Sequence, residues 1–175
     1  AYVPVQSGSP ALALLDLPLI GERQNETDGF AAALQMPWPG GVALYASAQS
    51  TGFALKSVLS APATIGRTLD PLSAGPEGRV DYGARLRVKL CSGMLTSADL
   101  VTVLSGANAA AILSEDGQWE VLQFLNAVLV DSGTYELSEL LRGQAGTEGA
   151  MRDPLAAGAQ FVLLDGAVQA VPVGV

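Results

Sequence analysis

The residues of this sequence that could do chemistry are carboxylates, because its 175 residues include 17 Asp and Glu but no histidine. Without imidazole there is no usual general base, no commonest metal ligand and no Ser-His-Asp or Cys-His arrangement. Glycoside hydrolysis stays open on residue types alone, since it needs only two carboxylates. The carboxylates that could take part are Glu22, Glu26, Asp28, Asp81, Glu115, Asp116, Glu120 and Glu148.

These carboxylates are better interpreted as surface or turn residues. Ligand clefts are usually lined by apolar and aromatic side chains, whereas aromatic residues make up only 6% of this chain. Charged side chains are mostly exposed in folded proteins. We therefore predict that the chain is not an enzyme and has no catalytic residues, and a hydrolase with two carboxylates is the least favoured function.

No cofactor or metal site is predicted. The pairs Glu26/Asp28 and Glu115/Asp116 could offer oxygens to calcium, but the ordered acidic loop of an EF-hand is absent and turns explain both pairs better. No GxxxxGK[ST] or GxGxxG motif follows a strand pattern, so a nucleotide site has no support. Cys91 is the only cysteine, which excludes an intrachain disulfide and leads us to expect a core residue.

Trp38 and Tyr45 are the candidates for contact with a ligand or a partner. Trp38 lies between prolines in the run Met36–Gly41, where its ring could stack on a sugar, anchor a partner or plug one end of the core. We favour the plug, because a large ring contributes much burial in a loop-rich fold. If the chain instead binds carbohydrate, the stacking platforms are Trp38, Tyr45, Tyr82 or Trp119.

The composition predicts a folded, soluble protein that does not bind nucleic acid. Hydrophobic residues make up 49% and charged residues 15%, which is enough apolar surface to offset the ordering entropy. The net charge of -8 repels phosphate backbones and anionic lipid headgroups. No apolar run approaches the ~20 residues that span a bilayer. Because the chain begins at Ala1 without Met or a basic leader, we expect no signal peptide and a piece of a longer polypeptide.

The elements that must position these residues are short β-strands. Gly (20) and Pro (10) interrupt the apolar runs, a texture typical of antiparallel sandwiches and barrels. Two short helices are predicted, Ser97–Leu104 with Ser97 as its cap and Gly106 as its end, and Thr147–Met151. The predicted strands are Ala11–Leu17, Phe30–Met36, Val42–Ser47, Phe53–Ser60, Ala63–Leu69, Arg85–Leu90, Ala109–Leu113, Trp119–Phe124, Ala127–Val130, Thr134–Leu140, Gln160–Leu164 and Val168–Val171.

Side-chain alternation and turn residues predict how these strands are arranged. Basic and aliphatic residues alternate in Arg85–Leu90, so one face should be wet and the other buried. The segment Trp119–Phe124 should be covered on both faces, because both of its alternate sets are largely apolar. Asp116-Gly117 and Asp165-Gly166 predict tight hairpins between their flanking strands, and Asp28-Gly29 precedes a third strand.

We predict one β-rich region over residues 1–175, built as an antiparallel sandwich or barrel or as two packed β subdomains. The Gly- and Pro-rich segment Asp70–Gly83 is the predicted place for a subdomain boundary. The most distinctive segment is Tyr135–Glu148, in which a strand runs into Arg142 and then a double-glycine turn. We expect Arg142 to pair with Glu148 or to bond loop carbonyls through its guanidinium donors.

The segments Trp38–Tyr45, Trp119–Phe124, Tyr135–Ser138, Leu140–Glu148 and Gly158–Asp165 carry a family resemblance. They are similar to the C-terminal region of the large tail-tip, or baseplate hub, protein of alphaproteobacterial gene transfer agents and related siphophage-like prophages. The likeness covers most of the chain, from about residue 11 to residue 166. The residues taken as its structural motif are Trp119, Phe124, Tyr135, Leu141, Arg142, Gly143, Gly146, Thr147 and Glu148.

The resemblance implies a β-rich domain of a multidomain protein whose other parts include a TIM barrel similar to glycoside hydrolases and hub domains that close the tail tube. It implies a place at the tail tip of a virion-like particle that assembles in the bacterial cytoplasm and is extracellular when released. It also implies host-envelope contact and several copies around the tail axis, and it supplies no catalytic residues. Gly21–Gly29 and Asp70–Gly83 are expected to vary in length, so neither is assigned a receptor.

Two functions follow as the main alternatives. The first is a structural interaction module that docks against other tail-tip proteins and copies of itself, and it predicts exposed apolar patches larger than the few hundred Å² usual for a monomer. The alternative is a carbohydrate-binding module that recognises cell-surface polysaccharide, and it requires an exposed aromatic ring.

Overall fold

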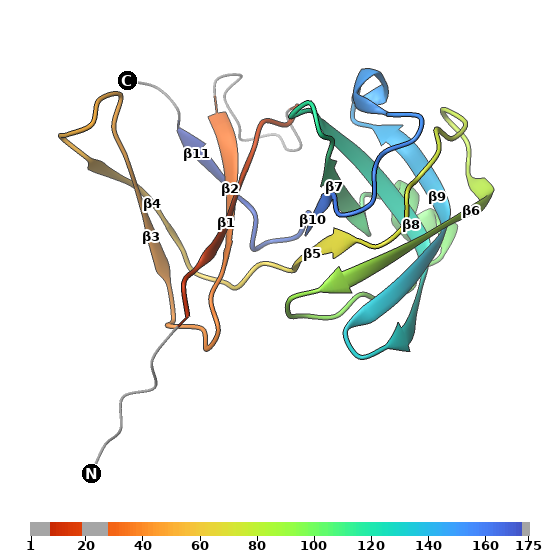
Figure 1. Ribbon diagram of the computed structural model, residues 1–175, viewed down its shortest axis with the longest axis horizontal. Helices are drawn as coiled ribbons and strands as arrows, with labels where there is room; N and C mark the ends of the chain where they lie inside the picture. The colour runs from red at the N-terminus through yellow and green to blue at the C-terminus, as the bar shows by residue number, and fades with distance from the viewer. Residues whose placement is uncertain (1–7, 19–27, 173–175) are drawn as a thin grey trace, which may run out of the picture. The chain divides into compact units, whose positions relative to one another are not determined.

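The computed structural model describes residues 8–18 and 28–172 and divides the chain into two compact units, whose strands Figure 1 labels. Unit 1 comprises Ala1–Ala63 and Gly166–Val175, and unit 2 comprises Thr64–Asp165. Both units are built mainly from antiparallel strands, which confirms the predicted fold class. Residues 21–27 of the expected variable segment lie outside the described residues.

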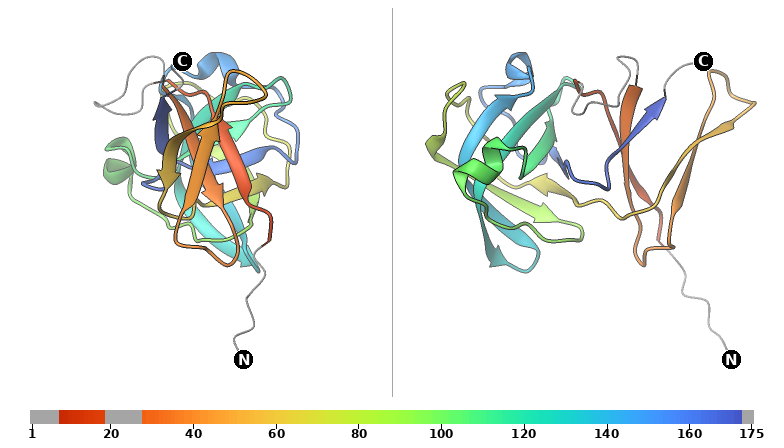
Figure 2. Two further views of the ribbon diagram at one scale, coloured as in Figure 1. Left: turned by 90° about the vertical axis from the view of Figure 1, so that its left-hand side faces the viewer. Right: turned by 180° about the vertical axis from the view of Figure 1, so that it is seen from behind.

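The described residues of unit 1 form two small antiparallel sheets, which Figure 2 shows as separate ribbons. The first has the strand order β1-β2-β11, and the second pairs β3 with β4. All five strands were predicted from the sequence to within a few residues at each end. Their bounds are β1 (Ala11–Leu15), β2 (Asp28–Leu34), β3 (Val42–Ala46), β4 (Ala54–Leu59) and β11 (Gln169–Pro172).

The core of unit 1 is made of small side chains. Ala31 and Ala33 of β2 are fully buried together with Leu59 of β4, and Val42 and Leu44 of β3 pack against them. Methyl side chains let a second layer approach the sheet closely, so the β3–β4 hairpin covers β2 with few atoms. One face of the hairpin is thereby used, and its opposite face stays outside this core.

Unit 2 is a closed six-stranded barrel with the order β10-β5-β6-β9-β8-β7. Closure gives every strand two neighbours, so the barrel has no open sheet edge along its paired stretches. The sequence pattern predicted strands at all six places, with Trp119–Phe124 and Ala127–Val130 now joined in β8. The bounds are β5 (Ile65–Thr68), β6 (Asp81–Leu90), β7 (Ala109–Leu113), β8 (Trp119–Asp131), β9 (Thr134–Gln144) and β10 (Gln160–Leu163).

The barrel interior is filled by alternate side chains of its strands. Leu86, Val88 and Leu90 of β6 are buried while the basic residues between them are exposed, which confirms the predicted wet and buried faces. Residues Trp119–Phe124 of β8 are all buried, also as predicted. One face of this strand points into the barrel core, where Phe124 lies. The opposite, outward face is covered by neighbouring segments.

Of the two short helices in the described ranges, the longer is α1 (Leu100–Leu104), which packs Val103 against Leu125 of β8. Its cap is Asp99, whose Oδ1 accepts a hydrogen bond of 2.8 Å from the Thr102 backbone N–H. The predicted cap, Ser97, was wrong, because its Oγ accepts from the backbone N–H of Ala127 on β8 instead. The second predicted helix is a single 3₁₀ turn, η1 (Glu148–Ala150). No helix within the described ranges is long and apolar enough to cross a membrane.

The two Asp-Gly turns between predicted strands had different outcomes. Asp116-Gly117 closes the hairpin between β7 and β8, which pair in register, so this prediction is confirmed. Asp165-Gly166 does not close a hairpin, because β10 pairs with β5 and β7 whereas β11 pairs with β2. Local turn chemistry fixes the bend but leaves open which distant edge the next strand will join. Asp28-Gly29 forms part of β2 rather than preceding it.

The boundaries between the units fall after Ala63 and after Asp165, and not within the Gly- and Pro-rich segment Asp70–Gly83, where a boundary was predicted. That segment belongs to unit 2 because Leu72 exchanges backbone hydrogen bonds of 2.9 and 2.8 Å with Leu155. Cys91 also departs from expectation, since it is exposed rather than in the core. It directly follows the inward-facing Leu90, so strand alternation points it outward.

Candidate functional site

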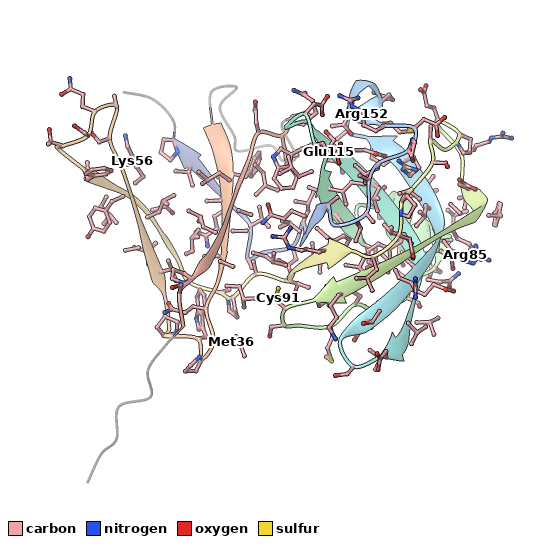
Figure 3. All side chains as sticks on the ribbon, in the orientation of Figure 1. Met36, Lys56, Arg85, Cys91, Glu115 and Arg152 are labelled. Atoms are coloured by element: carbon pink, nitrogen blue, oxygen red, sulfur yellow. The ribbon has the colours of Figure 1, made fainter. Side chains whose placement is uncertain are left out.

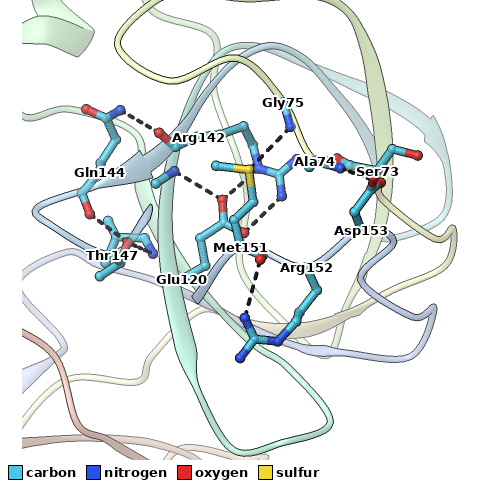
Figure 4. A network of polar contacts seen from close by, with 12 residues as sticks. Ser73, Ala74, Gly75, Glu120, Arg142, Gln144, Thr147, Met151, Arg152 and Asp153 are labelled. Atoms are coloured by element: carbon cyan, nitrogen blue, oxygen red, sulfur yellow. Dashed lines mark hydrogen bonds and ion pairs between the residues drawn. The ribbon is translucent and has the colours of Figure 1, made fainter. Parts of the chain in front are cut away.

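The most elaborate cluster of polar side chains is centred on a buried ion pair between Arg142 of β9 and Glu120 of β8. Their side chains are 0% and 3% exposed. Arg142 Nε lies 2.7 Å from Glu120 Oε1 and Nη2 lies 2.9 Å from Oε2, which is the bidentate geometry shown in Figure 4. The backbone N–H of Gly143 donates a third bond, of 3.1 Å, to Oε1. The carboxylate is therefore fully engaged inside the protein.

The same guanidinium fastens the 73–75 segment to the barrel wall. Arg142 Nη1 donates to the carbonyl of Ser73 at 2.7 Å, so the expected bond to a loop carbonyl is confirmed. The expected pairing with Glu148 is wrong, because Glu148 is exposed on η1 while Glu120 lies buried on the adjacent strand. The neighbouring Ala74 N–H donates to Asp153 Oδ1 at 3.0 Å.

The double-glycine turn of the predicted motif shapes the end of β9. Gly143 has φ +57, and a Cβ there would lie 2.9 Å from the Cα of Glu148, so both its backbone angle and its surroundings require glycine. Thr147 Oγ1 accepts from the Val121 N–H at 2.9 Å and donates to the Gln144 carbonyl at 2.7 Å. Gly146 also has a positive φ, of 78°. These residues hold the turn against β8.

The apolar residues of the predicted motif are packed inside unit 2. Phe124 and Tyr135 belong to the main core, Leu141 packs with Val103 on the outer side of the sheet, and Trp119 is buried. The predicted surface position of Glu120 is wrong, because its side chain is buried. The sequence did carry a signal for this burial, because Glu120 lies in a segment predicted to be covered on both faces. A carboxylate in such a segment needs a buried counter-charge.

A shallow groove lies beside the β7–β8 turn. It consists of two adjoining hollows of about 240 and 390 Å³, which share Ser114, Glu115, Leu155 and Ala156. At one end Asp116 is paired with Arg152, whose Nε lies 3.1 Å from Asp116 Oδ2. Within the described ranges, no three His, Cys, Asp or Glu side chains gather as metal ligands would.

The pKa of Asp116 is lowered to about 2, first by the hydroxyl of Ser114 and then by Arg152. The ionised Asp116 carboxylate therefore stabilises the folded state fully at pH values above its unfolded pKa of about 3.9. This stabilisation is lost as the pH falls toward 2. We expect Asp116→Asn to lower the melting temperature at pH 5 and to have little effect near pH 2. Thermal unfolding of both proteins at several pH values checks this, and a difference that does not shrink on acidification would contradict it.

The outer face of the β3–β4 hairpin is apolar and exposed in unit 1. Tyr45 pairs with Leu55 across the two strands, and their exposed fractions are 56% and 52%. Val58 and Phe53 on the same hairpin are exposed as well. We call these four side chains the hairpin face. Among the described residues, β3 and β4 pair only with each other, so both outer edges of the hairpin are also open.

Unit 2 carries two further exposed apolar groups. Val101 and Leu104 of α1 are 75% and 65% exposed on the side opposite the buried Val103. Residues 128–130 at the end of β8 are aliphatic, and all three are about half exposed. Apolar side chains clustered on regular elements in this way usually mark contact surfaces, whereas single exposed ones do not.

The two candidate contact residues from the sequence differ in exposure. Tyr45 is exposed on the hairpin face, whereas Trp38 is partly buried, between the plug that was favoured and a free stacking ring. Of the other proposed stacking residues, Trp119 is buried and Tyr82 is 66% exposed. Figure 3 shows the described side chains and labels Met36, two residues before Trp38, and Lys56, which follows Leu55 of the hairpin face.

Comparison with protein-family models finds a match to part of the chain. The sequence model described as Rcc01698-like, C-terminal, matches residues 63–162, which is more than half of the chain. The matched residues are nearly those of unit 2, so the match covers the barrel and the buried Arg142–Glu120 pair. No curated protein matches the chain.

Proposed function

The chain belongs to the Rcc01698-like, C-terminal family, and from this membership we propose that it is a structural interaction domain of a phage-like tail tip. The family is associated with the gene transfer agent of Rhodobacter capsulatus, which is compatible with a structural protein of such a particle. In the proposed role the domain sits in the baseplate hub, contacts neighbouring hub proteins or other copies of itself, and contributes to contact with the host envelope.

The observation that carries this proposal is the hairpin face. Tyr45, Leu55, Val58 and Phe53 gather on one small two-stranded sheet whose opposite face is already packed. Covering such side chains stabilises an assembly by about 25 cal/mol per Å² of apolar surface removed from water. Tyr and Phe are also among the residue types that are enriched at protein interfaces.

A structural, non-catalytic role also agrees with the surroundings of the buried Glu120 carboxylate. Glu120, the carboxylate best shielded from water among the described residues, accepts from Arg142 and Gly143 and has no open side toward a substrate. Around it, Thr147 and the 73–75 segment are fixed by further hydrogen bonds. We infer that the cluster stabilises the barrel and that the domain is not catalytic.

The test is incorporation of the protein into particles. Tyr45→Ser/Leu55→Ser in the complete protein should leave the melting temperature of the isolated chain within about 2 °C, because both side chains are exposed. The same change should lower, several-fold, the amount of the protein in purified particles, measured by quantitative immunoblot. Gln49→Ala, an exposed polar residue between β3 and β4, is the matched control. Full incorporation of the double variant would overturn the proposal.

Carbohydrate binding is the second candidate, because the exposed rings of Tyr45 and Phe53 lie on the same hairpin. An exposed ring on a flat sheet is what stacking on a sugar requires. Calorimetric titration of the isolated chain with host surface polysaccharide separates the two functions. Binding that is lost in Tyr45→Ser, together with normal incorporation into particles, would favour the polysaccharide over a protein partner.

A further inference from the structure

The outward side of β5 and β6 carries a row of four exposed basic residues. They are Arg67 on β5 and Arg85, Arg87 and Lys89 on β6, and we call them the basic wall. Figure 3 shows Arg85 at the outer surface of β6. The row stands out because the chain has net charge -8 and only 9 Lys and Arg in total. Basic residues are thus gathered on one wall of an otherwise acidic protein.

The strand geometry spaces these charges regularly. Same-face residues two apart on a strand are separated by about 6.6–6.8 Å, so the row from Arg85 to Lys89 extends over about 13 Å. Arg67 lies directly opposite Lys89 in the antiparallel register of β5 and β6. Like charges in directly opposed positions destabilise a sheet, so this pair is retained at some cost to the fold.

Carboxylates neutralise only one member of the basic wall within the described ranges. Arg87 is paired with Asp70, with Nε and Nη2 at 2.9 and 2.6 Å from its oxygens. The other three cations donate to backbone carbonyls instead. Arg67 donates a hydrogen bond of 3.2 Å to the carbonyl of Gly158. Arg85 donates to the carbonyls of Tyr82 and Ala84 at 3.0 and 2.8 Å. Lys89 donates to the carbonyl of Ser132. These contacts order the side chains without cancelling their charge.

Protection of a sheet edge does not explain the row. Charged side chains often keep an open edge strand from pairing with other chains. Strand β6, however, pairs with β5 on one side and with β9 on the other, so it is a central strand of a closed barrel. The charges face outward from the barrel, where a partner of opposite charge can approach.

We propose that the basic wall docks an extended acidic segment of a neighbouring protein in the particle. This inference rests on the proposed function, because the proposed place in a particle supplies the neighbouring protein. An extended segment with Asp or Glu at alternate positions repeats its carboxylates every ~6.8 Å. Every second carboxylate can then meet one of the unneutralised cations of β6, Arg85 and Lys89, which are about 13 Å apart. Arg67 and Lys89 then share a carboxylate-rich partner, and the repulsion between them is relieved on binding.

The experiment measures binding of fluorescent poly-L-glutamate to the whole chain by anisotropy, with poly-L-lysine as the negative probe. We expect binding at low ionic strength that weakens strongly between about 50 and 200 mM salt. Arg85→Glu should weaken it about tenfold. Arg79→Glu makes the same change in net charge at an exposed arginine outside the basic wall and should have a much smaller effect. Equal effects of the two substitutions would overturn the proposal.

Arg67→Glu gives a second and independent readout. It turns the like-charge pair with Lys89 into an opposite-charge pair, so the melting temperature should stay the same or rise by about 1–3 °C. Binding of poly-L-glutamate should nevertheless weaken, which a merely solvated row of charges would not show. Unchanged binding in this variant would count against docking at the wall.

Polygalacturonate separates an acidic protein segment from an anionic polysaccharide. If it binds as tightly as poly-L-glutamate and loses as much affinity in Arg85→Glu, the assignment to a protein segment is wrong. Weaker binding of the polysaccharide supports the assignment. The probe assay does not involve the hairpin face, and particle incorporation of Tyr45→Ser/Leu55→Ser does not involve the wall. A failure of the docking inference can therefore be told apart from a failure of the proposed function.

Discussion

Replacing Arg142 by Ala is expected to lower the free energy of unfolding by about 3–5 kcal/mol. The substitution would leave the Glu120 carboxylate buried without its counter-charge, and would also release the carbonyl of Ser73. Urea unfolding followed by tryptophan fluorescence, to which the buried Trp119 contributes, measures the change. At a typical domain stability of about 5–15 kcal/mol, a loss of this size can leave the variant largely unfolded at moderate temperature.

Arg152→Ala is the matched control for this prediction. Arg152 also pairs with a carboxylate, Asp116, but its side chain is 34% exposed, so its loss should cost about 1 kcal/mol or less. A second variant, Arg142→Met/Glu120→Met, removes both buried charges and should recover much of the stability lost in Arg142→Ala. If Arg142→Ala costs no more than Arg152→Ala, the buried pair does not stabilise the barrel.

The strands of this protein could be predicted from its sequence because their signal is local. Alternation in Arg85–Leu90 fixed which side chains of β6 face the core, and the same alternation placed three cations of the basic wall on one face. Gly and Pro marked the ends of most strands. The predicted strand Ala109–Leu113 has the same bounds as β7.

The pairing of distant strands could not be predicted in the same way. Asp165-Gly166 signals a bend, but whether β11 joins β10 or β2 depends on apolar surfaces more than a hundred residues away in the chain. The ion partner of Arg142 was missed for a related reason. Glu148 is close in sequence, whereas Glu120 is close only after β8 and β9 pair. Burial of the segment around Glu120 was foreseen, and it was the better guide to the partner.

Gly66→Ala should be strongly destabilising although it adds only one methyl group. Gly66 of β5 pairs with Leu90 of β6, and a Cβ at this position would overlap the backbone carbonyl oxygen of Lys89 and lie 3.1 Å from the Leu90 Cα. Backbone atoms of a paired strand cannot move aside without breaking the ladder, so the cost should be near the top of the range of about 1–3 kcal/mol for overpacking.

Gly149→Ala separates this steric effect from the general consequence of replacing glycine. Gly149 lies in η1 with no positive φ and no atom within 4 Å of an added Cβ, so its replacement should be neutral or stabilise by about 0.4–1 kcal/mol. Urea unfolding of the two variants under one set of conditions compares them directly. Because β5 also carries Arg67, displacement of this strand in Gly66→Ala should weaken poly-L-glutamate binding even in the folded fraction. Equal stabilities for the two variants would mean that β5 and β6 do not approach as closely as their register requires.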